Sequence, residues 1–164
     1  MILLKIRDAV LDDLPAMLSI YNDAIVKLTS TFDLDKQTYE QRKIWFDHHG
    51  DRFPLIVAEI NDEVVGYCSL SPYRQKLAYA QTVELSIYVS ESYRRQGIGK
   101  ALMSEILQRA HELGYHTVIS GIVGGNMGSI QLHERFGFIY IGCFKEVGYK
   151  FNAYRDVHFY QYMI

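Results

Sequence analysis

The sequence has little of several things that would mark a specialised protein. It contains only two cysteines, Cys68 and Cys143, and three scattered prolines, so neither a disulfide scaffold nor a disordered chain is expected. Its formal net charge is -2 at pH 7, which gives no large basic field for nucleic acid. The apolar start, residues 1–4, is soon interrupted by charges and is too short for a signal peptide or a membrane span. These absences favour a cytoplasmic protein with reduced thiols that binds neither nucleic acid nor membranes.

What the sequence does contain fits one domain that spans residues 1–164. Apolar residues make up 49% of the chain, and a domain of this length buries about 70% of the surface of its unfolded chain. No repeat or linker divides it. The 13 tyrosines are unusually many. They predict ring packing in a cleft or at a subunit contact, and their place in the last strands indicates a homodimer.

The apolar spacing predicts an α/β (α+β) domain, with a mixed, mostly antiparallel sheet and helices on both faces. Asn61-Asp62 is a hairpin signal, and the strand–helix–strand unit over residues 82–123 requires two parallel strands. Residues 71–81 form a long loop in this prediction, which makes them candidates for function. Strands are expected at residues 2–7, 55–60, 64–70, 82–89, 117–123, 138–144 and 154–162, and helices after Asp12 or Asp13, after Thr38, over residues 97–113 and after Asn126.

A basic, glycine-containing loop opens the third predicted helix. A helix N-terminus carries unpaired N–H groups and a positive dipole, and glycine lets a ligand approach the backbone, so this loop predicts a phosphate site. A Walker A loop would need Gly at 94 and Ser or Thr at 101, and a dinucleotide loop would need a third Gly at 102; neither fits. A glycine-rich turn with solvated arginines is the alternative. The loop consists of Arg94, Arg95, Gln96, Gly97, Ile98, Gly99 and Lys100.

The strand before this loop carries a carboxylate at its centre. Residues 82–89 alternate, so that Glu84, Ser86 and Tyr88 share one face. An acid in the middle of a strand is disfavoured unless it has a function. We expect Glu84 to be a general base that removes a proton from an ammonium group. An exposed acid on an edge strand is the alternative.

The loop pattern Arg-x-x-Gly-x-Gly resembles the pyrophosphate loop of the GNAT superfamily, the acyl-CoA N-acyltransferases. The segments at residues 21–25, 71–74, 82–89, 132–138 and 148–150 are similar to the phosphinothricin and methionine sulfoximine N-acetyltransferase branch of that superfamily. The likeness covers nearly the whole chain, in the right order. It implies the GNAT-type acyl-CoA N-acyltransferase fold, acetyl-CoA as cosubstrate and no metal.

The resemblance also implies a role for each site residue. Glu84 would be the base, and His133 or a tyrosine would meet the leaving thiolate, with a packed helix histidine as the alternative for His133. Arg74 would bind a substrate carboxylate through two parallel hydrogen bonds, with a solvated loop arginine as the alternative. The cofactor would contact Ile87, Tyr88, Val89, the loop at residues 94–100, Asn126 and Ser129, and the substrate would pack on Phe32 and Tyr73.

The sequence therefore predicts an N-acetyltransferase that acetylates the α-amino group of a small amino acid. The branch implies substrates such as phosphinothricin, methionine sulfoximine or methionine sulfone, an activity that gives antibiotic or herbicide resistance. Gln81, Lys76 and Tyr154 depart from residues common in the branch, and this leaves the particular amino acid open. Two alternatives stay open: a GNAT enzyme that acts on a protein N-terminus or a polyamine, and a non-catalytic CoA-binding module.

Overall fold

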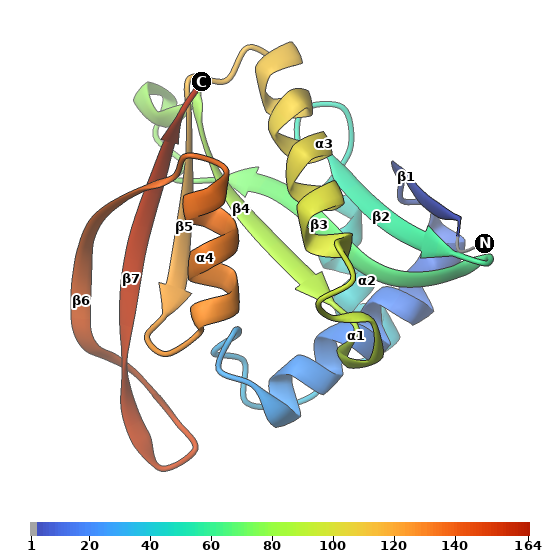
Figure 1. Ribbon diagram of the computed structural model, residues 1–164, viewed down its shortest axis with the longest axis horizontal. Coiled ribbons are helices and arrows are strands. Elements are labelled where there is room, and N and C mark those ends of the chain that lie inside the picture. Colours follow the sequence, from blue (N-terminus) through green and yellow to red (C-terminus); the bar gives the residue numbers. More distant parts are fainter. Residues whose placement is uncertain (1–2) are drawn as a thin grey trace.

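Seven strands form one mixed sheet in the order β1-β2-β3-β4-β5-β7-β6 (Figure 1). The computed structural model describes residues 3–164. All neighbouring strands are antiparallel except β4 and β5, which are parallel, as the strand–helix–strand unit predicts. The elements are β1 Leu4–Asp8, α1 Leu14–Lys27, α2 Tyr39–Asp47, β2 Leu55–Ile60, β3 Glu63–Pro72, β4 Thr82–Val89, α3 Ile98–Glu112, β5 Thr117–Val123, α4 Met127–Arg135, β6 Ile139–Lys150 and β7 Ala153–Met163, with short 3-10 turns at Leu11–Asp13, Leu77–Tyr79 and Glu91–Tyr93.

Local signals in the sequence set several of these boundaries. The Thr38 hydroxyl accepts from the Gln41 N–H at 3.2 Å, and the Gln41 side chain accepts from the Thr38 N–H at 2.9 Å, which completes the predicted capping box of α2. Asn61 and Asp62 have φ values of 51° and 65°, as a tight hairpin between β2 and β3 requires. Gly114, with φ 79°, follows the end of α3.

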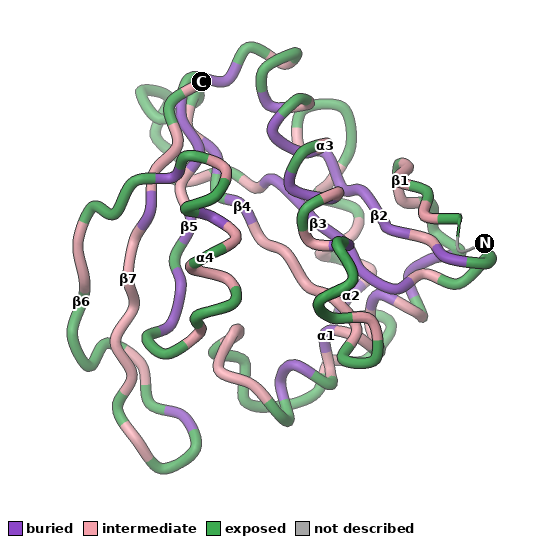
Figure 2. The backbone as a smooth tube through the Cα atoms, viewed as in Figure 1, coloured by how far each residue is buried: buried purple, intermediate pink, exposed green. Residues whose placement is uncertain are grey.

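The sheet is covered on both faces, and each face has its own apolar core. Alternate residues of β2 point to opposite sides: Ile56 packs in the cluster that contains α3, whereas Val57 packs in the cluster that contains α1. Side chains of α4 join the first cluster and side chains of α2 join the second. Strands β2 and β3 are buried along most of their length, whereas the β6–β7 hairpin is largely exposed or half-buried (Figure 2).

The parallel strands β4 and β5 pair over only three positions, Thr82 with Thr117 through Glu84 with Ile119. Beyond Glu84, β4 continues alongside β3 as far as Val89 while β5 diverges from it (Figure 1). A sheet that opens in this way leaves one edge of β4 without a strand partner in the middle of the molecule. This split is the feature that positions the site.

Several predicted elements differ from the structure in their bounds. The last two strands are longer than the predicted 138–144 and 154–162, because they form one hairpin around Phe151 and Asn152, whose φ values are 52° and 57°. Phe-Asn is not a strong turn signal, so its left-handed backbone was not predictable from the pair alone. The predicted loop at residues 71–81 is shorter, since β3 extends to Pro72 and a 3-10 turn occupies Leu77–Tyr79. The first strand runs from Leu4 to Asp8, and its predicted start at residue 2 lies outside the described residues.

Candidate active site

Glu84 lies at the point where β4 and β5 separate. It is the last residue of β4 that pairs with β5, opposite Ile119, and it pairs with Ser71 on its other side. In the described part of the chain no hydrogen bond or ion pair holds its carboxylate, and the side chain stays accessible to solvent. Surrounding protein nevertheless removes enough water to raise the pKa of Glu84 above its ordinary value. A free carboxylate with a raised pKa, open to a small amine, can act as a base.

The free edge of β4 offers backbone groups to a ligand. The Ser90 N–H donates to the Val65 carbonyl of β3 at 2.8 Å, and backbone groups of alternate residues in a strand face opposite edges. The groups of Leu85, Ile87 and Val89 therefore face the split. Those of Tyr88 face β3, so an extended ligand along this edge would meet the backbone of Ile87 and Val89. The predicted contact of Tyr88 with the cofactor stays a prediction. An extended amide-containing ligand can pair with this edge as an extra strand would.

The N-terminus of α3 presents the predicted phosphate cradle. Gly97 caps the helix with φ 81°, and its carbonyl accepts from the Ala101 N–H at 3.1 Å. The N–H groups of Ile98, Gly99 and Lys100 have no backbone acceptor in the described chain, as expected for a first helical turn. Gly99 lies so close to α4 that an added Cβ would stand 3.2 Å from a Leu132 methyl group.

The side chains of the cradle divide into two groups. The Ile98 side chain is buried in the core, so only its backbone is available to a ligand. Arg94, Arg95, Gln96 and Lys100 are exposed around the amides. Unpaired amides with exposed basic side chains beside them suit a diphosphate.

Asn126 and Ser129 lie at the start of α4, across the split from β4. The Asn126 side chain accepts from the Ser129 N–H at 3.3 Å, which caps α4 as predicted. Both residues are half-buried, so their polar groups remain within reach of a ligand in the split. Their predicted contact with the cofactor stays a prediction.

His133 is fully buried, with both ring nitrogens engaged. Its Nδ1 lies 2.7 Å from the Ser129 carbonyl, which can only accept, so Nδ1 carries the proton. Nε2 then accepts from the Ser120 hydroxyl at 3.0 Å. Burial lowers the pKa of His133, which keeps the ring neutral. In this arrangement neither nitrogen is free to protonate a thiolate, so the geometry favours the packed-histidine alternative.

The three predicted substrate residues are near the surface on two loops. Phe32 lies against the backbone of Gly148 in the β6–β7 hairpin and is 37% exposed. Tyr73 is half-buried and packs edge-on against Tyr79, with ring centres 5.5 Å apart. The exposed Arg74 guanidinium lies 5.1 Å from the centre of the Tyr73 ring. Arg74 has no acidic partner in the described residues, so it is available to a ligand without being fixed in place.

A cavity of about 270 Å³ lies on the α1–α2 face of the sheet, the face that also carries Glu84. Sequence reasoning did not find it, because its walls come from five separate segments. Its most unusual member is Arg42 of α2, a buried arginine. The lining residues are Tyr21, Asp33, Gln37, Arg42, Trp45, Tyr67, Ser69, Ser86 and Tyr88.

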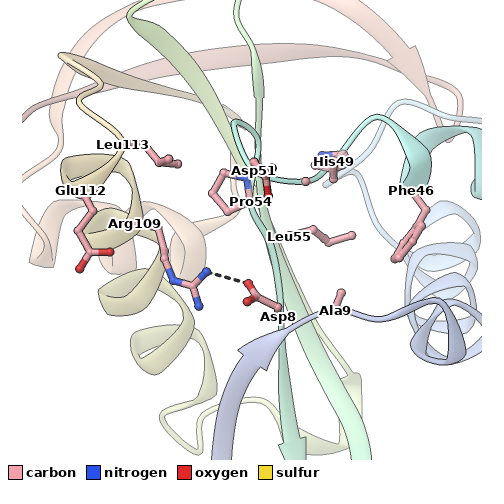
Figure 3. A pocket seen from close by; sticks show the side chains of 11 residues that line it. Asp8, Ala9, Phe46, His49, Asp51, Pro54, Leu55, Arg109, Glu112 and Leu113 are labelled. Atoms are coloured by element: carbon pink, nitrogen blue, oxygen red, sulfur yellow. Dashed lines mark hydrogen bonds and ion pairs between the residues drawn. The ribbon is translucent and has the colours of Figure 1, made fainter.

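A larger cavity, of about 380 Å³, lies elsewhere, between the end of β1 and the C-terminal part of α3 (Figure 3). Asp8 and Arg109 form an ion pair across it at 2.7 Å. None of the predicted site residues lines this cavity. The smaller cavity, which shares strand β4 with Glu84, is therefore the candidate for a ligand site.

One cluster of possible metal ligands occurs among residues 3–164. Cys143, Asp156 and His158 place one ligand atom each within 4.8 Å of one another on the β6–β7 hairpin. Asp156 already accepts from the Glu146 N–H at 2.7 Å, and His158 lies 3.3 Å from the Tyr140 hydroxyl. The sequence did not reveal this cluster, since its members come from two strands. The expectation of no metal stays a prediction.

Splayed parallel strands, an amide cradle at the next helix and a free carboxylate at the fork together define an acyl-CoA-dependent N-acyltransferase. The model of the acetyltransferase (GNAT) family matches residues 15–138, and the chain belongs to this family. The predicted family, fold and class of enzyme are thereby confirmed.

The relatives agree with this assignment over nearly the whole chain. A Pseudomonas aeruginosa protein named L-methionine sulfoximine/L-methionine sulfone acetyltransferase is 37% identical, over 96% of this chain and 92% of its own. A phosphinothricin N-acetyltransferase of Streptomyces coelicolor is 35% identical, over 96% and 94%. Among solved structures, a Staphylococcus aureus N-acetyltransferase superimposes with a TM-score of 0.95 at 38% identity and covers 98% of both chains. A Sinorhizobium meliloti phosphinothricin acetyltransferase in complex with AcCoA gives 0.95 at 34%, over 98% of this chain and 88% of its own.

Proposed function

We propose that this enzyme transfers the acetyl group of acetyl-CoA to the α-amino group of a small amino acid. The observation that carries the proposal is the free Glu84 carboxylate at the fork of β4 and β5, on the same face of β4 as two residues that line a polar cavity, Ser86 and Tyr88. The cradle fits a diphosphate and the β4 edge fits an amide-containing arm, so residues of this chain suit coenzyme A. The relatives' names support methionine sulfoximine, methionine sulfone and phosphinothricin as substrates.

Different residues have separate roles in the proposed reaction. The amides of Ile98, Gly99 and Lys100 hold the diphosphate, and the β4 edge at Ile87 and Val89 orients the thioester arm. Glu84 accepts a proton from the acceptor's ammonium group, directly or through one water, and releases the free amine for attack on the thioester. An N–H group of the β4 edge donates to the thioester oxygen as negative charge develops there. Holding both reactants in one cleft makes the attack effectively intramolecular.

We do not propose His133 as the group that donates a proton to the leaving thiolate. Its hydrogen bonds to Ser129 and Ser120 join α4 to β5, and this link fixes the start of α4 beside the split. A tyrosine on the cleft remains the second candidate for the donor.

A single assay separates this function from its alternatives. The purified protein is mixed with acetyl-CoA and a panel of amines, and free thiol is measured. Release with methionine sulfone or phosphinothricin, and acetylation at the α-nitrogen by mass spectrometry, is the expected result. Release only with peptides or polyamines would assign another acceptor, and binding of CoA without release from any amine would leave a non-catalytic module.

We also infer that two copies pair through the β6–β7 hairpin. Large apolar side chains on this hairpin are exposed, among them Ile141, Phe144, Tyr149 and Tyr154, each at 57% or more. An apolar patch of this kind marks an interaction surface, and tyrosine suits such contacts. Sedimentation should give a dimer that Phe144→Glu converts to a monomer; a wild-type monomer at micromolar concentration would refute the pairing.

The cellular location is a further part of the proposal. In the described chain no helix is long and apolar enough to cross a membrane. Cys68 is buried and unpaired, and Cys143 is also unpaired. Free thiols together with a metabolite-sized cosubstrate support a cytoplasmic enzyme.

A further inference from the structure

Arg42 is a buried cation without a counter-ion. Its side chain projects from α2, the residue is only 4% exposed, and among residues 3–164 no carboxylate forms an ion pair with it. The guanidinium carbon lies 3.8 Å from the centre of the Tyr21 ring and 3.6 Å from that of Trp45. One terminal nitrogen donates to the Tyr67 hydroxyl at 3.0 Å, while the buried Nε–H has no acceptor in the described residues.

A charge in this position is costly unless something compensates it. The two aromatic faces attract the cation, but each such contact contributes only about 0.5–2 kcal/mol, whereas removing an ion from water costs several kcal/mol. An anionic ligand would supply the missing partner. A guanidinium matches a carboxylate in particular, because its parallel N–H groups meet both oxygens.

The cavity that Arg42 lines also carries a negative charge and several hydroxyl groups. Asp33 accepts from the Tyr21 hydroxyl and, at 3.4 Å, from the Gln37 side chain, and it makes no ion pair with Arg42. Hydroxyl groups of Ser69 and Ser86 complete the polar wall. A small cavity with one cation and one anion, separated from each other, suits a zwitterion better than a simple anion or a polyamine.

The position of the cavity connects it to the chemistry. Ser86 lies two residues from Glu84 on the same face of β4, about 7 Å along the strand. The α-amine of an amino acid lies beside its α-carboxylate, so a ligand held at Arg42 has its amine on the face of β4 that carries Glu84. One water can complete the path for the proton from that amine to the Glu84 carboxylate. Arg74, the residue favoured by the sequence, lies exposed on a loop and does not line this cavity.

We propose that Arg42 binds the α-carboxylate of the acceptor amino acid inside the α1–α2 cavity. This inference rests on the proposed function, since it gives the acceptor's carboxylate a defined place. It makes Arg42 a specificity-determining residue: acceptors with a free carboxylate bind, whereas amides, amines and internal peptide positions do not complete the charge pair.

The test compares methionine sulfone with its α-carboxamide, which differs only at the group in question. We expect the wild-type enzyme to prefer the acid, and Arg42→Met to reduce the acid-to-amide ratio of kcat/KM by about 10- to 100-fold. Arg42→Lys should lose part of the ratio, because it keeps the charge without the fork. Arg135→Met, which removes an exposed arginine of α4, is the matched control. The ratio is an internal measure that a merely weakened fold does not move, and an unchanged KM for acetyl-CoA checks the fold.

Each outcome decides the matter. A wild-type enzyme that acetylates acid and amide equally, or an Arg42→Met enzyme that keeps the full preference, overturns the inference and leaves the proposed function intact. Loss of the preference in Arg74→Met alone would move the carboxylate to the loop. If wild type acetylates no amino acid, the proposed function fails. Equilibrium dialysis of methionine sulfone with CoA present then decides: binding that Arg42→Met abolishes supports the site, and no binding to wild type overturns it.

Discussion

Replacing Glu84 by Gln tests the central step of the proposed mechanism. The substitution keeps the size of the side chain and removes its ability to accept a proton. Glu84 makes no hydrogen bond or ion pair in the described chain, so its loss should leave the fold and the binding of acetyl-CoA almost unchanged. A positioned general base contributes about 10²- to 10⁴-fold to a rate, and we expect kcat at pH 7 to fall by that factor. This corresponds to about 2.7–5.4 kcal/mol in the activation barrier.

The pH profile gives a second, independent readout. Burial raises the pKa of Glu84, so the wild-type rate should fall as the pH drops through that raised value, because a protonated carboxyl cannot accept a proton. In Glu84→Gln this limb should disappear, and the rate should climb with pH as the free amine itself becomes more abundant. Thiol release with methionine sulfone, followed from pH 5 to pH 9.5, measures both profiles. Glu105→Gln is the control, since Glu105 is a carboxylate of α3 that pairs with Arg109.

The reasoning fails if the substituted enzyme keeps a rate close to wild type with the same dependence on pH. It also fails if the loss appears entirely as a higher KM for the amino acid, since that would make Glu84 a binding group. A parallel loss in Glu105→Gln would point to a general effect of charge.

Three further predictions concern the cradle, the substrate loop and the buried histidine. Gly97→Ala should raise the KM for acetyl-CoA and lower the free energy of unfolding by about 1–2 kcal/mol, because the φ of Gly97 is 81°. Titration with CoA measures the first effect and urea unfolding the second. An unchanged KM would argue against the cradle. Gly148→Ala should raise the KM for the amino acid but not the KM for acetyl-CoA, because the added Cβ would collide with the Phe32 ring. Gly142→Ala is the control, since its Cβ would meet open space. Equal effects of the two substitutions would remove Phe32 from the site. The free energy of unfolding should fall as the pH drops below about 6.5, and His133 should contribute up to about 1.4 kcal/mol per pH unit, because its unfolded ring takes up a proton that the buried neutral ring does not. Urea unfolding of His133→Gln should show a smaller decrease with falling pH. The same decrease in both proteins would contradict the buried neutral state.

Much of the fold follows from short stretches of sequence. Strand β4 runs over residues 82–89 and β5 over residues 117–123, as their alternation predicts. The caps at Thr38 and Asn126 also hold, because each depends on residues three positions apart. The β6–β7 hairpin was predicted too short, since its turn at Phe151-Asn152 is held by the pairing of the two strands and not by the turn residues.

The same distinction between local and long-range determinants applies to the predicted site. The cradle at residues 97–100 and the face of Glu84 depend on local geometry, which a helix start and a strand period fix by themselves. The direction in which a backbone group points across a sheet depends instead on the pairing with neighbouring strands. The N–H and C=O groups of Tyr88, for example, point toward β3 because of the register with that strand. His133 could not be placed either, since its partner Ser120 is on another element.

The sequence alone determined the order of elements, the glycine-containing turn that opens α3 and a carboxylate on a defined face of its strand, because each depends on neighbours within a few residues. The tertiary structure alone decided where β5 departs from β4, and it buried Arg42 between rings from α1 and α2. It also gathered five segments around one cavity. The physical reason is that burial and the absence of a counter-ion are properties of surroundings, and those surroundings come from residues far apart in the chain.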